Sequence, residues 1–415
     1  MNPAYKKLME KADTMQIIDT HEHLQPHKSH LLDAPDFICD YFSHYITSDL
    51  TAAGMPQEEL SMIPGSISRV YDRRVDIRER YAILEPYLDL VRNTSYFRSL
   101  TTAAAKLYQI PDITRETIAL LNEKFQALNG REDYRRHVMK EVCHIQISIN
   151  DCWRDDLPAV TTELFTPAWH PDAYVSVGDK LDCVTLSDYC AAYKKHFLQQ
   201  LRDGMCTLKC ALAYSRSLYF EEVEAETAAQ LFAQFDPEEG EPAPKALQDY
   251  MMHQVLALAD EAEFVIQIHT GLQEGMYHNL ADSNPMLLKN LFGKYRRMRF
   301  DLFHIGYPYD REIITLAKYF PNVYVDMCWA HIISPAASRA FLREAMDVLP
   351  YSKILGFGGD YMFYDGVCGH LTMAKQNICE VLAEKVERGE ISEALAETML
   401  QAILHDNAAR VFRIE

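Results

Sequence analysis

Two histidines one residue apart, His21 and His23, end a short apolar run in the segment IIDTHEHLQ, residues 17 to 25. Side chains two residues apart in a β-strand point to the same side, so Asp19, His21 and His23 would line one face. Two neutral imidazoles at this spacing make a pair of metal ligands. Short His-x-His matches also arise by chance, so the metal interpretation depends on the rest of the chain.

Four later strand-like runs also end in a polar or ionisable residue. TLKCA carries Lys209, FVIQIHTG ends in His269, FDLFHIG ends in His304 and ILGFGGD ends in Asp360. Each has an ordinary structural explanation: a histidine in the core, a lysine that extends its ammonium to the surface, or an aspartate in a turn or helix cap. All of these explanations would have to hold independently at the matching ends of five strands. The pattern as a whole therefore indicates a metal site.

Strands and helices that could position these residues alternate from about residue 137 onward. The strand-like runs are VCHIQISI, LDCVTL, MCTLKCALAY, FVIQIHTG, RFDLFHIG, VYVDMCW and KILGFGGD, with amphipathic stretches between them. With IIDTHEH they make eight candidate strands. This alternation predicts an α/β fold, a closed (β/α)₈ TIM barrel whose active site lies at the carboxyl ends of the strands.

Two segments do not fit a minimal barrel. Residues from about 35 to 135 read as mostly helical, which predicts a helical insertion after the first strand, near the barrel mouth, within one domain spanning residues 1–415. Residues 235–244, FDPEEGEPAP, read as an exposed acidic connection before a helix.

Composition narrows the class of protein. The chain has 415 residues, enough for a large core, and its net charge of −19 argues against nucleic acid or an anionic membrane surface as a partner. Its ten cysteines are scattered without a CxxC, and the segment after the first lysines is too polar for a signal peptide. We expect a cytoplasmic protein with a small-molecule substrate and no membrane span; a homo-oligomer is compatible with the sequence.

The order His-x-His, Lys, His, His, Asp on strands one, four, five, six and eight resembles the amidohydrolase superfamily. The resemblance extends to the terminal DNAARVF, with Asn407 and Phe412, and the insertion resembles the uronate isomerase branch. It implies that one divalent metal is held by His21, His23 and Asp360 and a second by His269 and His304, bridged by a carboxylated Lys209. The rival is one metal on His21, His23, His269 and Asp360, with His304 as an acid or orienting group and Lys209 as an ammonium. These ligands suit Zn²⁺ best, with Mn²⁺, Fe²⁺ and Ni²⁺ also compatible.

The resemblance implies an amidohydrolase-type enzyme that uses metal-activated water on a small molecule with an amide, lactone or other ester bond. Asp360 would take the proton of that water and pass it to the leaving group, with His304 as the second catalytic candidate. The substrate-binding candidates are Tyr214, Arg216, Tyr307 and Trp329, and Arg216 would suit a substrate carboxylate. Asp19 is expected to be a structural partner near the barrel floor. Four alternatives stay open: a uronate-isomerase-like aldose/ketose isomerase, a metal-dependent decarboxylase, a non-catalytic barrel, and a metal-free TIM-barrel enzyme in which these histidines act as acids and bases.

Overall fold

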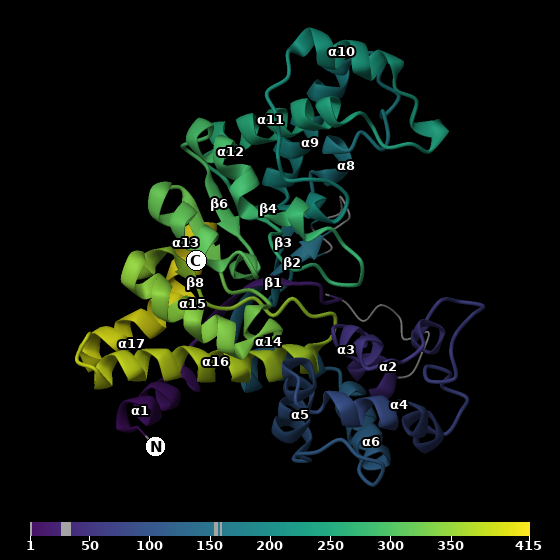
Figure 1. The fold of residues 1–415 in the computed structure, drawn as a ribbon, viewed down its shortest axis with the longest axis vertical. Helices are drawn as coiled ribbons and strands as arrows, with labels where there is room; N and C mark the ends of the chain where they lie inside the picture. Colours follow the sequence, from purple (N-terminus) through teal and green to yellow (C-terminus); the bar gives the residue numbers. More distant parts are fainter. Residues whose placement is uncertain (1, 26–34, 153–156, 158–159) are drawn as a thin grey trace.

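Eight parallel strands form a barrel in the computed structural model, which describes residues 2–25, 35–152, 157 and 160–415 (Figure 1). Each strand pairs with the next along the chain, which confirms the predicted TIM barrel. The strands are β1 Ile17–Glu22, β2 Ile145–Cys152, β3 Phe165–Trp169, β4 Thr207–Cys210, β5 Val265–Ile268, β6 Arg299–Leu302, β7 Val323–Asp326 and β8 Ile354–Leu355.

The barrel closes between β1 and the segment that follows β8. The Thr20 amide donates to the Phe357 carbonyl (3.0 Å), and the Asp360 amide donates to the carbonyl of His21 (2.9 Å). The His23 amide in turn donates to the Tyr361 carbonyl (3.1 Å). These bonds place two residues that are far apart in the sequence, His21 and Asp360, beside each other at the carboxyl end of the barrel.

Helices surround the barrel, and one lies across its amino end. Ile18, Ile149 and Val265, from three different strands, form an apolar cluster with Val411 and Phe412 of α18. The Asn407 side chain at the start of α18 donates to the carbonyls of Tyr351 and Ile354. The helices outside the β1–β2 connection are α1 Pro3–Ala12, α8 Asp172–Val175, α9 Leu186–Arg202, α10 Ala225–Gln234, α11 Lys245–Glu261, α12 Lys289–Lys294, α13 Asp310–Tyr319, α14 Ala330–Ile333, α15 Pro335–Val348, α16 Tyr364–Glu387, α17 Glu393–Gln401 and α18 Asn407–Phe412.

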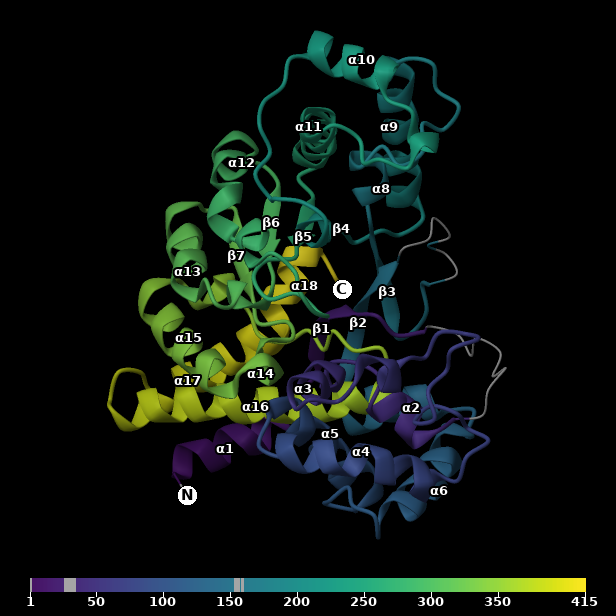
Figure 2. The ribbon, with the colours of Figure 1, turned by 45° about the vertical axis from the view of Figure 1, so that its right-hand side comes forward.

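The connection from β1 to β2 contains the predicted run of helices, which gather beside α16 (Figures 1 and 2). They are α2 Phe37–Tyr41, α3 Ile46–Ala52, α4 Ile77–Val91, α5 Ser95–Tyr108, α6 Ile118–Asn129 and α7 Tyr134–Arg136. Helix α5 packs closely on α16, where a side chain at Gly369 would lie 2.2 Å from the Ser99 carbonyl oxygen. The hydroxyls of Tyr41, Tyr108 and Tyr134 all donate to the buried carboxylate of Asp365 in α16 (2.9, 2.5 and 2.5 Å). These bonds fasten three insertion helices to the barrel's longest helix.

One predicted strand is wrong. LDCVTL, residues 181–186, is a surface loop that leads into α9: Leu181 and Asp182 have positive φ, and Val184 is 85% exposed. Two of its apolar residues, Leu181 and Val184, are exposed and form no buried strand face. The third strand is β3 instead. It contains Pro167, which has no backbone N–H to donate, and a proline in the middle of a run argues against predicting a strand there.

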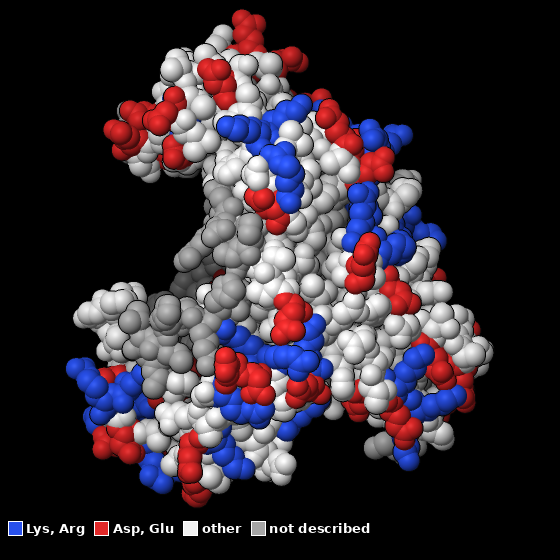
Figure 3. Space-filling view, turned by 180° about the vertical axis from the view of Figure 1, so that it is seen from behind, with Lys and Arg blue, Asp and Glu red and all other residues white. Residues whose placement is uncertain are grey.

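The surface carries charges of both signs, with an acidic region at the end that holds α10 (Figure 3). Glu224, Glu226, Glu238 and Glu241 are exposed there, beside and within the connection at residues 235–244. In the described part of the chain, no helix combines the length and apolar character needed to cross a membrane.

Candidate metal centre

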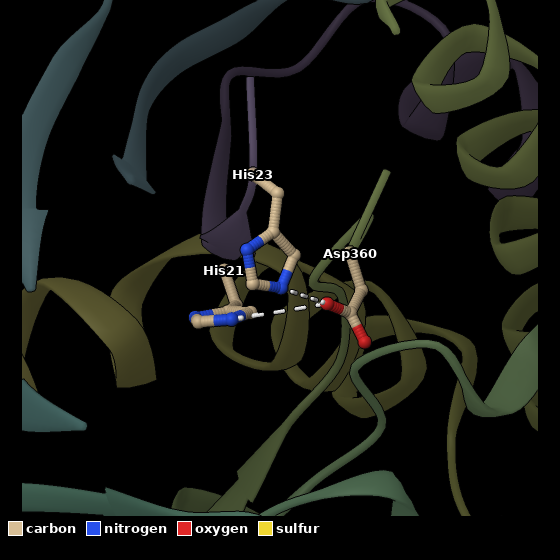
Figure 4. Close-up of side chains that lie close together, drawn as sticks. All are labelled: His21, His23 and Asp360. Atoms are coloured by element: carbon tan, nitrogen blue, oxygen red, sulfur yellow. Dashed lines mark ion pairs between the residues drawn. The ribbon is translucent and has the colours of Figure 1, made fainter. Parts of the chain in front are cut away.

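His21, His23 and Asp360 converge at the carboxyl end of the barrel (Figure 4). Asp360 Oδ1 lies 3.0 Å from His23 Nε2 and 3.8 Å from His21 Nε2. The side chain of His21 is fully buried, whereas that of His23 is 31% exposed. Two imidazoles and a carboxylate with this convergence can hold a divalent cation, and the partial exposure of His23 brings one side of the group to solvent.

The backbone around Asp360 is shaped to bring its carboxylate to this point. Asp360 itself has a left-handed φ of 57°. A side chain on the preceding Gly359 would lie 1.8 Å from Glu22 Oε1, so this position requires glycine. Asp19 Oδ1 accepts hydrogen bonds from the amides of Gly359 (3.1 Å) and His21 (3.2 Å). Asp19 therefore joins β1 to the segment after β8 as a structural partner, consistent with the sequence-based expectation.

His269 and His304 face each other beside the same carboxylate. His304 Nδ1 lies 2.9 Å from the Cys328 carbonyl and His269 Nε2 lies 2.8 Å from the Leu272 carbonyl, so both of these nitrogens must carry the hydrogen. The remaining nitrogens, His304 Nε2 and His269 Nδ1, are 3.1 Å apart with lone pairs opposed. Two nitrogens on one tetrahedral zinc would be roughly 3.3 Å apart. This donor set therefore fits a shared cation.

Electrostatics keep these ligands in the forms that bind metal. Burial lowers the pKa of His21 and of His269 well below the usual range and that of His304 to about 4, and the charge of Lys209 acts in the same direction. Burial opposes ionisation of Asp360, but the hydrogen bond from His23 outweighs it and holds the Asp360 pKa well below its usual value. His21, His269 and His304 thus offer neutral imidazole nitrogens around an ionised carboxylate. Burial opposes the charge of His23, but its hydrogen bond to Asp360 outweighs burial and raises the His23 pKa.

Lys209 joins this cluster from β4. Its side chain is buried, and Nζ lies 3.3 Å from His21 Nε2 and 3.8 Å from the centre of the Phe303 ring. All six residues expected to bind metal are therefore brought together at one end of the barrel. Lys209 lies next to His21, one of the three residues expected to hold the first metal.

Three further residues reach the site that the sequence reasoning missed. Asp151, near the end of β2, and His170, directly after β3, form a buried ion pair next to His21 and His23. Both satisfy the same strand-end rule that identified the other residues, but β2 was expected to end at residue 149 and β3 was misplaced. The third is Cys328 after β7, whose thiol lies close enough to His304 and Asp360 to belong to a ligand group.

The four substrate-binding candidates separate into two groups. The Tyr214 ring lies 4.7 Å from the His269 ring, and Trp329 contacts His304 edge-on with ring centres 5.2 Å apart. Arg216 instead pairs with Asp249 of α11 and donates to Gln248, so its guanidinium is engaged within the protein, and its role toward a substrate carboxylate stays a prediction. Tyr307 is half-buried in the apolar core, and its contact with the neighbouring loop is made by its carbonyl, which accepts the Leu272 amide (2.6 Å).

Comparison with known proteins shows which family the second half of the barrel resembles. Residues 220–414, which contain His269, His304 and Asp360, match the amidohydrolase family model. The chain is thus similar to amidohydrolases over nearly half of its length. The match extends from the connection before α10 to the end of α18 and thus includes β5 to β8.

Two relatives differ in how much of the chain they match. FluG of Emericella nidulans is 29% identical over 176 residues, which are 41% of this chain and only 20% of that protein. A uronate isomerase from Thermotoga neapolitana is 21% identical over 468 residues, 99% of this chain and 97% of its own.

Solved structures of similar fold cover almost the whole chain. A uronate isomerase from Thermotoga maritima has a TM-score of 0.80 at 16% identity, with 99% of this chain and 98% of that chain covered. A Lactobacillus casei protein provisionally named a metal-dependent hydrolase has a TM-score of 0.69 at 18% identity, covering 98% and 97%. At such low identity these structures support the fold alone. The insertion after β1 is part of the length that both share with this chain.

Proposed function

We propose that the protein is a metal-dependent hydrolase of a small molecule that carries an amide, lactone or other ester bond. The observation that carries this proposal is the position of Asp360. Its ionised carboxylate stands between His23 Nε2 (3.0 Å) and His304 Nε2 (3.9 Å) at the open end of the barrel. A base in that position can take a proton from an attacking water and return it to a leaving group.

His21, His23 and Asp360 would hold one divalent cation, and His269 and His304 would provide ligands for a second if Lys209 is carboxylated. A divalent cation bound there lowers the pKa of water from 15.7 to about 7 and polarises the oxygen of the scissile group. Zn²⁺ is the proposed metal because imidazole nitrogen and carboxylate oxygen are its common ligands. His304 supports the reaction by holding its Nδ1–H on the Cys328 carbonyl, so that its Nε2 stays directed at Asp360.

The second candidate is an aldose/ketose isomerase that acts on a sugar acid. The likeness to uronate isomerases along almost the whole chain, including the insertion, favours it. The pairing of Arg216 with Asp249 counts against it, because this guanidinium is then not available for the carboxylate of a sugar acid. A sugar acid's carboxylate would therefore have to be bound by other groups.

A substrate panel assayed in ¹⁸O-labelled water separates the two reactions. Hydrolysis of a lactone, amide or ester places one solvent oxygen in the acid product, whereas isomerisation of a sugar acid only redistributes hydrogen between neighbouring carbons. We expect zinc-loaded protein to label the product of at least one lactone, amide or ester, and Asp360→Asn to reduce that rate about 10²- to 10⁴-fold. Interconversion of aldose and ketose sugar acids, without labelling from any ester or amide, would establish the isomerase instead.

A further inference from the structure

A buried ion pair at the ends of β2 and β3 lies directly beside the proposed metal ligands. Asp151 Oδ1 contacts His170 Nε2, and the two side chains are only 1% and 4% exposed. Behind them, His170 Nδ1 lies 3.7 Å from Asp172 Oδ2, and that oxygen accepts the Ala211 amide (2.7 Å). Asp151 is thus fixed through His170 to the start of α8 and the end of β4.

The second carboxylate oxygen of Asp151 faces the two histidines of β1. Oδ2 lies 3.5 Å from His23 Nδ1 and 3.6 Å from His21 Nε2. It is buried and has no hydrogen-bond partner among the described residues. Burying a carboxylate oxygen without a hydrogen bond is costly, so a function in the metal centre explains why the fold keeps it there.

His23 is the ligand that needs support from a neighbour. His21 is fully buried and packs against the Phe303 ring (4.9 Å between centres), whereas the side chain of His23 is 31% exposed. The two nitrogens of His23 face different carboxylates: Nε2 faces Asp360 and Nδ1 faces Asp151. A metal-binding histidine usually gives its other N–H to a carboxylate, which fixes the tautomer and the orientation of the ring.

We propose that Asp151, held in place by His170, is the positioning residue for His23. By receiving the Nδ1–H of His23, Asp151 leaves the Nε2 lone pair directed at the metal and adds a negative charge beside the cation. This inference rests on the proposed metal site and extends it to a pair of residues on β2 and β3. It predicts that the pair controls metal affinity rather than the folding of the barrel.

Zinc affinity, measured by competition with a chromogenic chelator, tests the proposal. We expect Asp151→Asn to bind zinc about 10- to 100-fold more weakly than the wild type, and His170→Gln to shift the affinity in the same direction. Asp151→Glu, which keeps the charge, should recover part of the loss. Asp301→Asn is the matched control: Asp301 is also a fully buried strand carboxyl, and it makes no ion pair with His21 or His23. Its zinc affinity should equal that of the wild type.

A second readout separates a positioning role from a general loss of structure. In protein loaded with Co²⁺, the visible absorption bands report ligand geometry, and they should change in Asp151→Asn but not in Asp301→Asn. Wild-type zinc affinity and an unchanged cobalt spectrum in Asp151→Asn would overturn the proposal while leaving the metal site intact. A wild-type protein that binds no zinc would overturn both the proposal and the metal-dependent hydrolase.

Discussion

The hydroxyl of Tyr45 links the insertion to the backbone of Asp360, and Tyr45→Phe removes only that link. The hydroxyl donates to the Asp360 carbonyl at 2.5 Å, and both groups are buried. The phenylalanine ring would still stack on Trp329, whose ring centre is 4.5 Å away at an interplanar angle of 16°. The variant therefore isolates one hydrogen bond from the packing around it.

The expected cost follows from what the lost donor leaves behind. Among the described residues, Tyr45 alone donates to the Asp360 carbonyl, so the variant buries an unpaired acceptor. An unsatisfied buried polar group costs about 1–3 kcal/mol, more than the net 0.5–1.5 kcal/mol of an average hydrogen bond. We expect the free energy of unfolding of Tyr45→Phe to fall by about 1–3 kcal/mol.

Urea denaturation of the metal-free protein, followed by fluorescence and by circular dichroism, measures this change. Tyr319→Phe is the control, because Tyr319 is 79% exposed and should change the stability by less than about 0.5 kcal/mol. If Tyr45→Phe is as stable as that control, the hydroxyl does not support the Asp360 backbone and the reasoning is wrong.

Three further predictions concern the insertion and Lys209. Arg80→Met should destabilise the protein by about 3–5 kcal/mol in urea titrations, because it strands the buried Asp36 carboxylate that Arg80 pairs with. Burial opposes the ionisation of Asp36, but the bonds from Arg80 outweigh burial and lower the Asp36 pKa. The pair therefore stabilises the protein above about pH 4, and this stabilisation is lost as the pH falls through the lowered pKa of the folded state. Arg80→Met should not show this loss of stability at low pH. Tyr108→Phe should cost about 1.5–3 kcal/mol in the same titration, since it removes one of three donors to the Asp365 carboxylate; equal stability would contradict the contact. Lys209→Ala, grown with zinc and bicarbonate, should hold at least one metal ion fewer per chain by elemental analysis; an unchanged content would favour the single-metal site.

Much of the site could be predicted from the sequence because a parallel barrel gathers its strand ends at one place. His21, Lys209, His269 and Asp360 each end an apolar run, and no knowledge of the loops is needed to expect them together. The same rule would have found Asp151, had β2 been extended by two residues.

Other features depend on tertiary contacts that local sequence patterns do not encode. His170 was missed because Pro167 argued against a strand at residues 165–169, and the exposed loop at residues 181–186 was predicted to be the third strand instead. Arg216 comes soon after β4, the strand of Lys209, yet its guanidinium pairs with Asp249 of α11. The hydrogen bond from Tyr45 to Asp360 spans 315 positions of sequence, so no local pattern could reveal it.

The metal content of the purified protein tests the central claim most directly. Protein grown with zinc and bicarbonate should contain between one and two zinc ions per chain by elemental analysis. The double variant His21→Ala/His23→Ala, shown by circular dichroism to be folded, should lose the ion that these two residues hold with Asp360. A wild type without metal, or a double variant with unchanged zinc, would contradict the metal centre and the hydrolase built on it.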